Sequence, residues 1–172
     1  MRALQSERLT LRMVELKDAP FIHELYNSED FLQFIGDKNI RSESDARVYI
    51  EEKILGMHRE FGVCLLLVEV TESGEKIGVC GLIKRPELDA YDIGYGFMPS
   101  SYGKGFGYEA GKAVINYACE TNKIEDLVAI TTSDNKGSRA LLSKLGFTYV
   151  KVQDTLSDTV DLLLYQLSLC RE

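Results

Sequence analysis

The sequence has little that would place it in a membrane, outside the cell or on nucleic acid. None of its apolar runs approaches the ~20 residues that a bilayer-spanning helix needs. The opening segment, Met1–Arg8, lacks the apolar stretch of a secretory signal, so we expect no export by that route. The formal net charge is -7 and no basic stripe interrupts it, which makes nucleic acid a poor candidate partner.

Cysteine and histidine are also scarce. The four cysteines are Cys64, Cys80, Cys119 and Cys170. None belongs to a C-x-x-C pair, and no His-rich segment accompanies them, so we expect no metal site and no disulfide framework. A reduced, cytoplasmic compartment fits this pattern.

What is present is the composition of an ordinary globular protein. Of the 172 residues, 45% are apolar and 27% are charged. A chain of this length supports one domain with a substantial core, so we expect a single domain over residues 1–172.

Hydrophobic periodicity and turn residues predict an α+β fold. Strands are expected at 9–13, 63–70, 76–84, 91–98, 127–131, 147–152 and 160–169. Helices are expected at about 18–26, 30–35, 42–59 and 107–121, with a short one between Asn135 and Gly146. Asp18 with Pro20, and Ser42 with Asp45, supply capping signals for two of these helices. The result is a mixed sheet of about seven strands with helices on both faces.

The most informative segment spans residues 92–111, where a strand leads through a glycine-rich turn into a helix. Gly103, Gly105 and Gly107 let the backbone approach a ligand with no Cβ in the way. The unpaired N–H groups and the positive dipole end of the helix point at the same spot, and Lys104 adds a positive charge. These features favour a pyrophosphate site over the alternative, a tight turn with no ligand.

Two common phosphate motifs fit this turn poorly. A Walker A loop needs G-x-x-x-x-G-K-[ST], and the stretch from Gly107 to Lys112 is one residue short and ends in Ala113. Gly105–Ala110 matches the G-x-G-x-x-A dinucleotide fingerprint, with Asp126 about 20 residues further on. That acid precedes a strand where it should follow one, and the motif lies mid-chain after a hairpin.

A third interpretation rests on resemblance to a family. Tyr102–Gly107 is similar to the R/Q-x-x-G-x-G/A signature of the GNAT acetyltransferases, with Tyr102 where Arg or Gln is usual. An aromatic residue at that position resembles the branch that contains the ribosomal-protein N-terminal acetyltransferases. Further similar segments, in the family's order, are Ser6–Arg12 with Asp18 and Ala19, Ile93–Pro99, Glu109 with Ala110, Asn135–Phe147 and Asp161–Tyr165.

The resemblance implies acetyl-CoA as acyl donor and an amine as acceptor. The pyrophosphate would lie on the amides of Gly103–Gly107, in a turn that also carries Tyr102, Lys104 and Phe106. The strands 91–98 and 127–131 would splay apart, so that the pantetheine arm pairs with the exposed edge. A backbone N–H near Phe97 or Met98 would polarise the thioester carbonyl. Tyr102 is expected to pack at the turn.

The catalytic residues are less fixed by the resemblance. Asp92 is the first candidate for taking the amine's proton, although it would equally suit the start of a strand; Glu87 and Asp89 are weaker candidates. The tyrosine that many members supply as general acid is replaced by Leu142. Tyr95, Ser138 or water would then serve.

Several alternatives stay open. Asn135 would hydrogen-bond the pantetheine, cap its helix, or do both. The function is either amine N-acetylation by direct attack in a ternary complex or non-catalytic acyl-CoA binding, and the replacement at Leu142 supports the second. Acceptor contacts are expected from 26–59 and the 153–159 loop. The acidic residues of the first region indicate either a cationic acceptor or an ordinary solvated surface. The oligomeric state is open.

Overall fold

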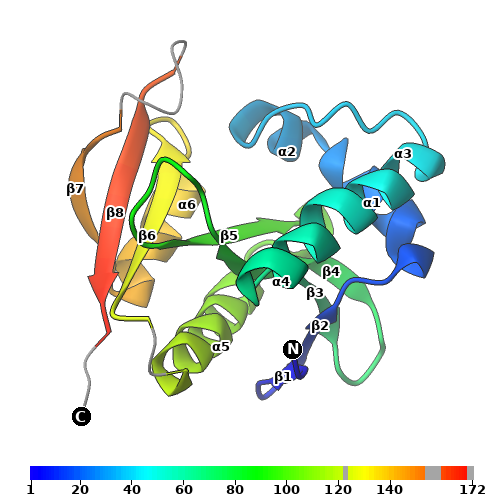
Figure 1. Cartoon of the computed structure of the whole chain (residues 1–172), viewed down its shortest axis with the longest axis horizontal. Helices are drawn as coiled ribbons and strands as arrows, with labels where there is room; N and C mark the ends of the chain where they lie inside the picture. Colours follow the sequence, from blue (N-terminus) through cyan, green and yellow to red (C-terminus); the bar gives the residue numbers. More distant parts are fainter. Residues whose placement is uncertain (122–123, 154–159, 170–172) are drawn as a thin grey trace.

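The computed structural model describes residues 1–121, 124–153 and 160–169, and its centre is one mixed sheet (Figure 1). The strands are β1 (Leu4–Gln5), β2 (Leu9–Met13), β3 (Leu65–Val70), β4 (Lys76–Ile83), β5 (Tyr91–Phe97), β6 (Asp126–Thr132), β7 (Thr148–Val152) and β8 (Leu162–Ser168). Their order in the sheet is β1-β2-β3-β4-β5-β6-β8-β7. Every neighbouring pair is antiparallel except β5 with β6.

The helices are α1 (Ala19–Tyr26), α2 (Glu29–Phe34), α3 (Glu43–Tyr49), α4 (Gly56–Phe61), α5 (Phe106–Glu120) and α6 (Lys136–Leu145). A π-helical segment, Ile50–Leu55, joins α3 to α4, where the sequence predicts one uninterrupted helix. None of these helices is long and apolar enough to cross a membrane. Cys64, Cys80 and Cys119 form no disulfide.

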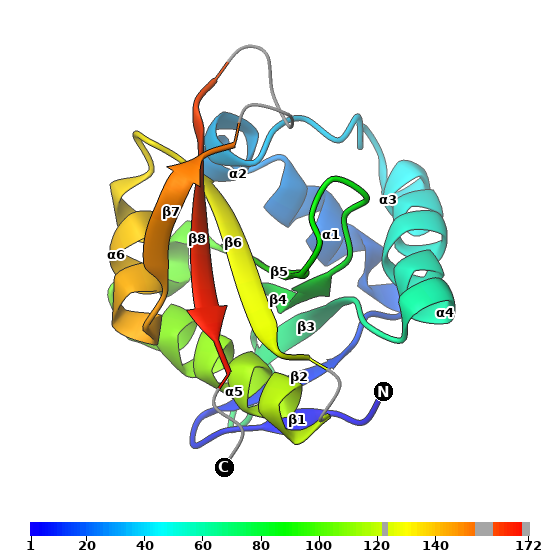
Figure 2. The ribbon, with the colours of Figure 1, turned by 60° about the vertical axis from the view of Figure 1, so that its left-hand side comes forward.

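Helices cover both faces of the sheet, as expected, with α5 and α6 on one face and α1 to α4 on the other (Figure 2). A Cβ added at Gly107 of α5 would lie 3.2 Å from Leu141 of α6 and 3.7 Å from the Phe97 ring of β5. A Cβ added at Gly96 of β5 would instead meet the Phe31 ring of α2 at 3.2 Å. Successive residues of β5 therefore point alternately to the two helical layers.

The sequence predicts the fold correctly and the strand number nearly so. The additional strand is β1, whose two residues pair with Leu11 and Thr10 of β2. Two residues are too few to show a period, which is why the sequence gives no sign of this strand. The loop expected between the last two strands falls largely on residues 154–159, outside the described ranges.

The strands β5 and β6 splay apart, as the fold prediction requires. They pair only at their first residues, Tyr91 with Leu127 and Asp92 with Val128. Beyond these two positions β5 keeps its pairing with β4 as far as Phe97, while β6 follows β8 (Figure 1). The diverging strands leave one edge of β5 without a neighbouring strand.

The role of Asp18 differs from the capping role expected for it. Its carboxylate is fully buried and makes no cap hydrogen bond to α1. It accepts hydrogen bonds from Arg12 at 2.8 and 3.0 Å and from the Glu15 amide at 2.8 Å, and it pairs with Lys76 at 2.8 Å. Burial opposes its charge, but the hydrogen bonds from Arg12 and Lys76 hold the pKa of Asp18 well below its usual range. Asp18 thus ties the start of α1 to the sheet.

Candidate active site

The glycine-rich turn between β5 and α5 presents a row of free backbone donors. Gly103 and Gly105 have φ angles of +73° and +80°, a left-handed conformation that glycine adopts without strain. The first amide to close the helix is Glu109, which donates to the Gly105 carbonyl at 3.1 Å. The amides of Gly103–Gly107 donate no hydrogen bond to any described residue. Lys104 is exposed beside them and forms no ion pair with the described part of the chain.

The free edge of β5 carries a second kind of donor. The Met98 amide donates to the Ile77 carbonyl of the neighbouring chain segment at 2.8 Å, so it is already engaged. Along an antiparallel strand the N–H groups point alternately to either side, so the Phe97 amide points away from β4. Because β6 has diverged at this point, the Phe97 amide faces the gap between β5 and β6. Of the two amides considered, Phe97 is therefore the one placed to meet a ligand carbonyl.

The structure brings Tyr95 and Ser138 together across this gap. The Tyr95 hydroxyl lies 2.8 Å from Ser138 Oγ, and either atom is able to donate. Burial raises the pKa of Tyr95 well above its usual value, so its hydroxyl stays protonated at neutral pH. Leu142, which occupies the family's usual tyrosine position, is fully buried in the core. Two hydroxyls, one from β5 and one from α6, thus lie near the place where that tyrosine is missing.

Asn135 caps α6, and its amide nitrogen stays available. Its Oδ1 accepts from the Ser138 amide at 3.1 Å, as the N-cap interpretation predicts. Its Nδ2 makes no hydrogen bond within the described ranges, so capping leaves a donor for a ligand. Tyr102, at the start of the glycine turn, is 49% exposed. Partial burial and the nearby Asp30 carboxylate of α2 raise the pKa of Tyr102 to about 12.

Asp92 lies on the opposite side of β5 from Tyr95. It is 1% exposed, and its Oδ2 accepts a hydrogen bond from Arg85 Nε at 2.7 Å. Its Oδ1 makes no hydrogen bond of normal geometry with any described residue. Burial raises the pKa of Asp92 to about 6, although the charge and hydrogen bond of Arg85 and the backbone of Ile130 oppose this change. A buried, half-satisfied carboxylate of this kind suits a proton acceptor.

Alternation along β5 separates the two sets of side chains. Asp92, with Gly94 and Gly96, points to the layer of α1 to α4, whereas Tyr95 and Phe97 point to α5 and α6. An acceptor that approaches Asp92 therefore enters from the side opposite to the Tyr95–Ser138 pair. This arrangement allows a proton to be taken on one side of the strand and given on the other.

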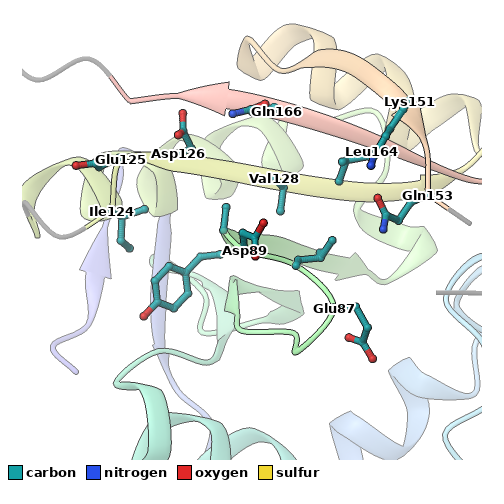
Figure 3. Close-up of a pocket in the computed structure, with 13 residues that line it drawn as sticks. Glu87, Asp89, Ile124, Glu125, Asp126, Val128, Lys151, Gln153, Leu164 and Gln166 are labelled. Atoms are coloured by element: carbon teal, nitrogen blue, oxygen red, sulfur yellow. The ribbon is translucent and has the colours of Figure 1, made fainter. Parts of the chain in front are cut away.

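A cavity of about 540 Å³ opens on the Asp92 side of the sheet. The loop that carries Glu87 and Asp89 forms one wall, and the strands β6, β8 and β7 form the other (Figure 3). Val128, the cross-strand partner of Asp92, lies on the cavity wall. Glu87, Asp89, Glu125 and Asp126 line it together with a single cation, Lys151. The weaker candidates Glu87 and Asp89 are thus wall residues, whereas Asp92 is buried and is not one of the described residues that line the cavity. Among the described residues, no group of three or more His, Cys, Asp or Glu side chains is arranged to hold a metal ion.

Two residues of this site escaped the sequence predictions. Arg85, the partner of Asp92, comes from a loop whose path no sequence pattern indicates. Arg8, the residue before β2, donates to the Lys104 carbonyl in the glycine turn at 3.0 Å. Arg8 belongs to the segment that resembles the GNAT family, but nothing in the spacing shows which side chain reaches the turn.

The splayed strand pair, followed by a turn of free amides, has the form that the resemblance to the GNAT acetyltransferases implies. In agreement, the family model "Acetyltransferase (GNAT) domain" matches residues 8–148. The chain belongs to the GNAT acetyltransferase family and is an acyltransferase. The uncharacterized N-acetyltransferase p20 of Bacillus licheniformis is 30% identical over 148 residues, 86% of this chain and 83% of that protein.

Solved structures share the fold at lower identity. An acetyltransferase from Agrobacterium tumefaciens str. C58 matches with a TM-score of 0.82 and 24% identity, over 97% of this chain and 94% of that one. RimL, a ribosomal L7/L12 alpha-N-protein acetyltransferase in complex with coenzyme A, matches with a TM-score of 0.81 and 20% identity over 98% of each chain. At these identities the likeness establishes the fold alone.

Proposed function

We propose that the protein transfers an acetyl group from acetyl-CoA to a primary amine, either a protein N-terminus or a small molecule, by direct attack in a ternary complex. The observation that carries this proposal is the run of five unbonded amides, Gly103–Gly107, next to the free edge of β5. Amides at a helix start bind phosphate, and a free strand edge binds an extended chain. Coenzyme A carries a pyrophosphate followed by a pantetheine arm, so it needs a phosphate site next to a free strand edge. RimL, with the same fold, was solved with coenzyme A bound.

On the donor side, each part of acetyl-CoA would have a partner. The pyrophosphate lies on the glycine turn, with Lys104 supplying a positive charge and Tyr102 and Phe106 flanking it. The pantetheine amides pair with the edge of β5, and Asn135 Nδ2 donates to one of the pantetheine carbonyls. The Phe97 amide donates to the thioester oxygen, where negative charge develops as the amine attacks.

On the acceptor side, Asp92 takes a proton from the attacking amine. An ammonium ion has no lone pair, so the proton must leave before or during attack. With a pKa of about 6, Asp92 is mostly ionised at neutral pH. Five residues of extended strand, about 16 Å, separate it from Phe97, so it would accept this proton through a chain of waters. The carboxylates of the cavity wall would attract a cationic amine toward it.

The thiolate of coenzyme A leaves on the other side of β5. The Tyr95–Ser138 pair would donate the proton that this sulfur needs. Because Ser138 Oγ and Tyr95 Oη share one hydrogen bond, loss of a proton from one hydroxyl is stabilised by the other. A coenzyme A thiolate is also a tolerable leaving group, so this step is expected to assist turnover without being essential to it.

Two measurements test the proposal. Acetyl-CoA should raise the melting temperature, because a ligand that binds only the folded state stabilises it by mass action. A panel of amines, with detection of acetylated products by mass spectrometry, should then identify the acceptor. A melting curve that millimolar acetyl-CoA leaves unchanged would contradict the proposal.

The second candidate is a non-catalytic acyl-CoA sensor on the same fold. Leu142 in place of the usual tyrosine favours it, because the side chain lacks a proton to donate. A sensor would show the acetyl-CoA-dependent melting shift but release no free thiol with any amine. Thiol release above the rate of spontaneous hydrolysis would rule it out.

A further inference from the structure

The N-terminal segment is tied to α5 by two Arg–Glu pairs of similar length in very different settings. Arg8 Nε lies 2.7 Å from Glu109 Oε2 at the start of α5, and Arg2 Nη2 lies 2.7 Å from Glu120 Oε2 at its end. The second pair is largely exposed, with side-chain exposures of 75% and 60%, whereas Glu109 is 16% exposed. Only the first pair touches the glycine turn.

Glu109 gathers the first pair into a network. Its Oε1 accepts hydrogen bonds from the Ser6 hydroxyl at 2.7 Å and the Arg8 amide at 2.6 Å, and its Oε2 accepts from Arg8 Nε at 2.7 Å. Burial works against its charge, but these hydrogen bonds lower the pKa of Glu109 below its usual value. The ionised Glu109 therefore holds the Arg8 guanidinium in one orientation.

The rest of the Arg8 guanidinium is directed at the glycine turn. Its Cζ lies 4.5 Å from the centre of the Phe106 ring, and its Nη1 donates to the Lys104 carbonyl at 3.0 Å. Its Nη2 lies 3.4 Å from where a Cβ on Gly105 would be. One side chain thus contacts Lys104 and Phe106 and lies beside Gly105 between them.

The bond to the Lys104 carbonyl has a consequence for the next amide. The Lys104–Gly105 peptide is trans, and in a trans peptide the C=O and the N–H point in opposite directions. Holding the carbonyl toward Arg8 therefore holds the Gly105 N–H away from it, as one of the free amides of the turn. Gly103 and Gly105, on either side of Lys104, leave the backbone of the turn flexible. A hydrogen bond from a residue outside the turn therefore restricts its conformation.

We infer that Arg8 is a positioning residue for the acyl donor: it fixes the Gly105 amide for the donor's phosphate and neutralises Glu109 beside that site. The inference rests on the proposed function, because it assumes that the turn binds the diphosphate of coenzyme A. Arg8 acts on the affinity for the donor and leaves the chemical step alone.

The test compares Arg8→Gln with Arg2→Gln. The second variant removes the arginine of the exposed Arg2–Glu120 pair, which joins the same two segments away from the glycine turn. Calorimetric titration with coenzyme A should show about tenfold weaker binding for Arg8→Gln and unchanged binding for Arg2→Gln. With the acceptor found by the amine panel, the KM for acetyl-CoA of Arg8→Gln should rise by a similar factor, while kcat stays within about twofold.

Arg8→Lys separates positioning from charge alone. A lysine keeps the positive charge beside Glu109 but lacks the planar fork that reaches Glu109 and the Lys104 carbonyl together. It should restore the melting temperature of the ligand-free protein without restoring the affinity for coenzyme A. If the Arg8→Gln protein is unfolded, the titration of Arg8→Lys decides the question.

Three results would overturn the inference. They are wild-type affinity in both Arg8 variants, an equal loss of affinity in Arg2→Gln, or a fall in kcat with KM unchanged. A wild-type protein that fails to bind coenzyme A would overturn the proposed function, and the role of Arg8 with it.

Discussion

The donor half and the acceptor half that we propose for this site are built in different ways. The donor half consists mainly of backbone groups from one continuous segment, the amides of Gly103–Gly107 and the Phe97 amide a few residues before them. The acceptor half consists of side chains from separate segments: Asp92 on β5, Arg85 in the preceding loop, and a cavity wall from β6, β7 and β8. Backbone donors are the same whatever the side chains are, whereas a wall of side chains changes with each substitution. Under the proposed function, a substitution would therefore disturb acceptor binding more readily than donor binding.

The largest difference between the two halves is expected when a side chain is placed in the glycine turn of the donor half. Gly105→Glu should weaken acetyl-CoA binding at least about 100-fold, because the new side chain would start 3.4 Å from Arg8 Nη2, disturb the turn and place a negative charge beside the phosphate site. The loss of the acetyl-CoA-dependent shift in melting temperature measures this effect.

A matched control separates the phosphate site from backbone strain. Gly74, in the turn between β3 and β4, has a φ of +71°, close to the +80° of Gly105, and its Cβ position is open. Gly74→Glu should lower the melting temperature of the ligand-free protein by a similar amount and keep the full acetyl-CoA shift. A lost shift in both variants would show that strain alone explains the result.

The next largest effect is expected in the acceptor half. Asp92→Asn should lower kcat about 100-fold, since an amide is unable to accept the amine's proton. The affinity for coenzyme A should be unchanged, because Asp92 lies on the other side of β5 from the donor's partners. Asp89→Asn, a change of the same kind on the cavity wall, should cost far less in kcat. Equal losses in the two variants would remove Asp92 from the role of base.

A smaller effect is expected where the two halves meet, at the Tyr95–Ser138 pair. Tyr95→Phe should lower kcat about tenfold, because water remains to protonate the thiolate. Ser138→Ala should have an effect of similar size, and the double variant should lose little more than either single variant if the two hydroxyls act as one unit. Fully additive losses would indicate two independent roles.

The smallest effect is a shift along the pH axis. The pKa of Asp92 is raised to about 6, so kcat/KM should increase as pH rises through about 6 and Asp92 loses its proton. Arg85 favours the charged form, so Arg85→Gln should move this acid limb upward by about one pH unit. The limb should vanish in Asp92→Asn. An acid limb at the same pH in all three proteins would assign it to another group.

The sequence predicts features that depend on neighbouring residues better than it predicts contacts between distant segments. The glycine turn and the Asn135 cap are local features, because each depends on residues close together in the chain. The splay joins β5 and β6, which lie far apart in the sequence, and only the resemblance to the family implied it. Arg8 reaches the Lys104 carbonyl across 96 positions of the sequence, and no periodic pattern records such a contact. Asp18 has the sequence position of a helix cap but is buried among Arg12 and Lys76, since tertiary packing prevails over a local preference.

The burial of Leu142 limits which side chains position 142 is able to accept, tyrosine included. Its side chain has no exposed surface and adjoins a well-filled interior, so the six-membered ring and hydroxyl of Leu142→Tyr would have to displace neighbouring atoms. Such a replacement would demand compensating reductions in volume elsewhere, and several simultaneous changes are rarer than one. A single substitution at position 142 therefore could not easily replace the proton donors that we propose, Tyr95 and Ser138.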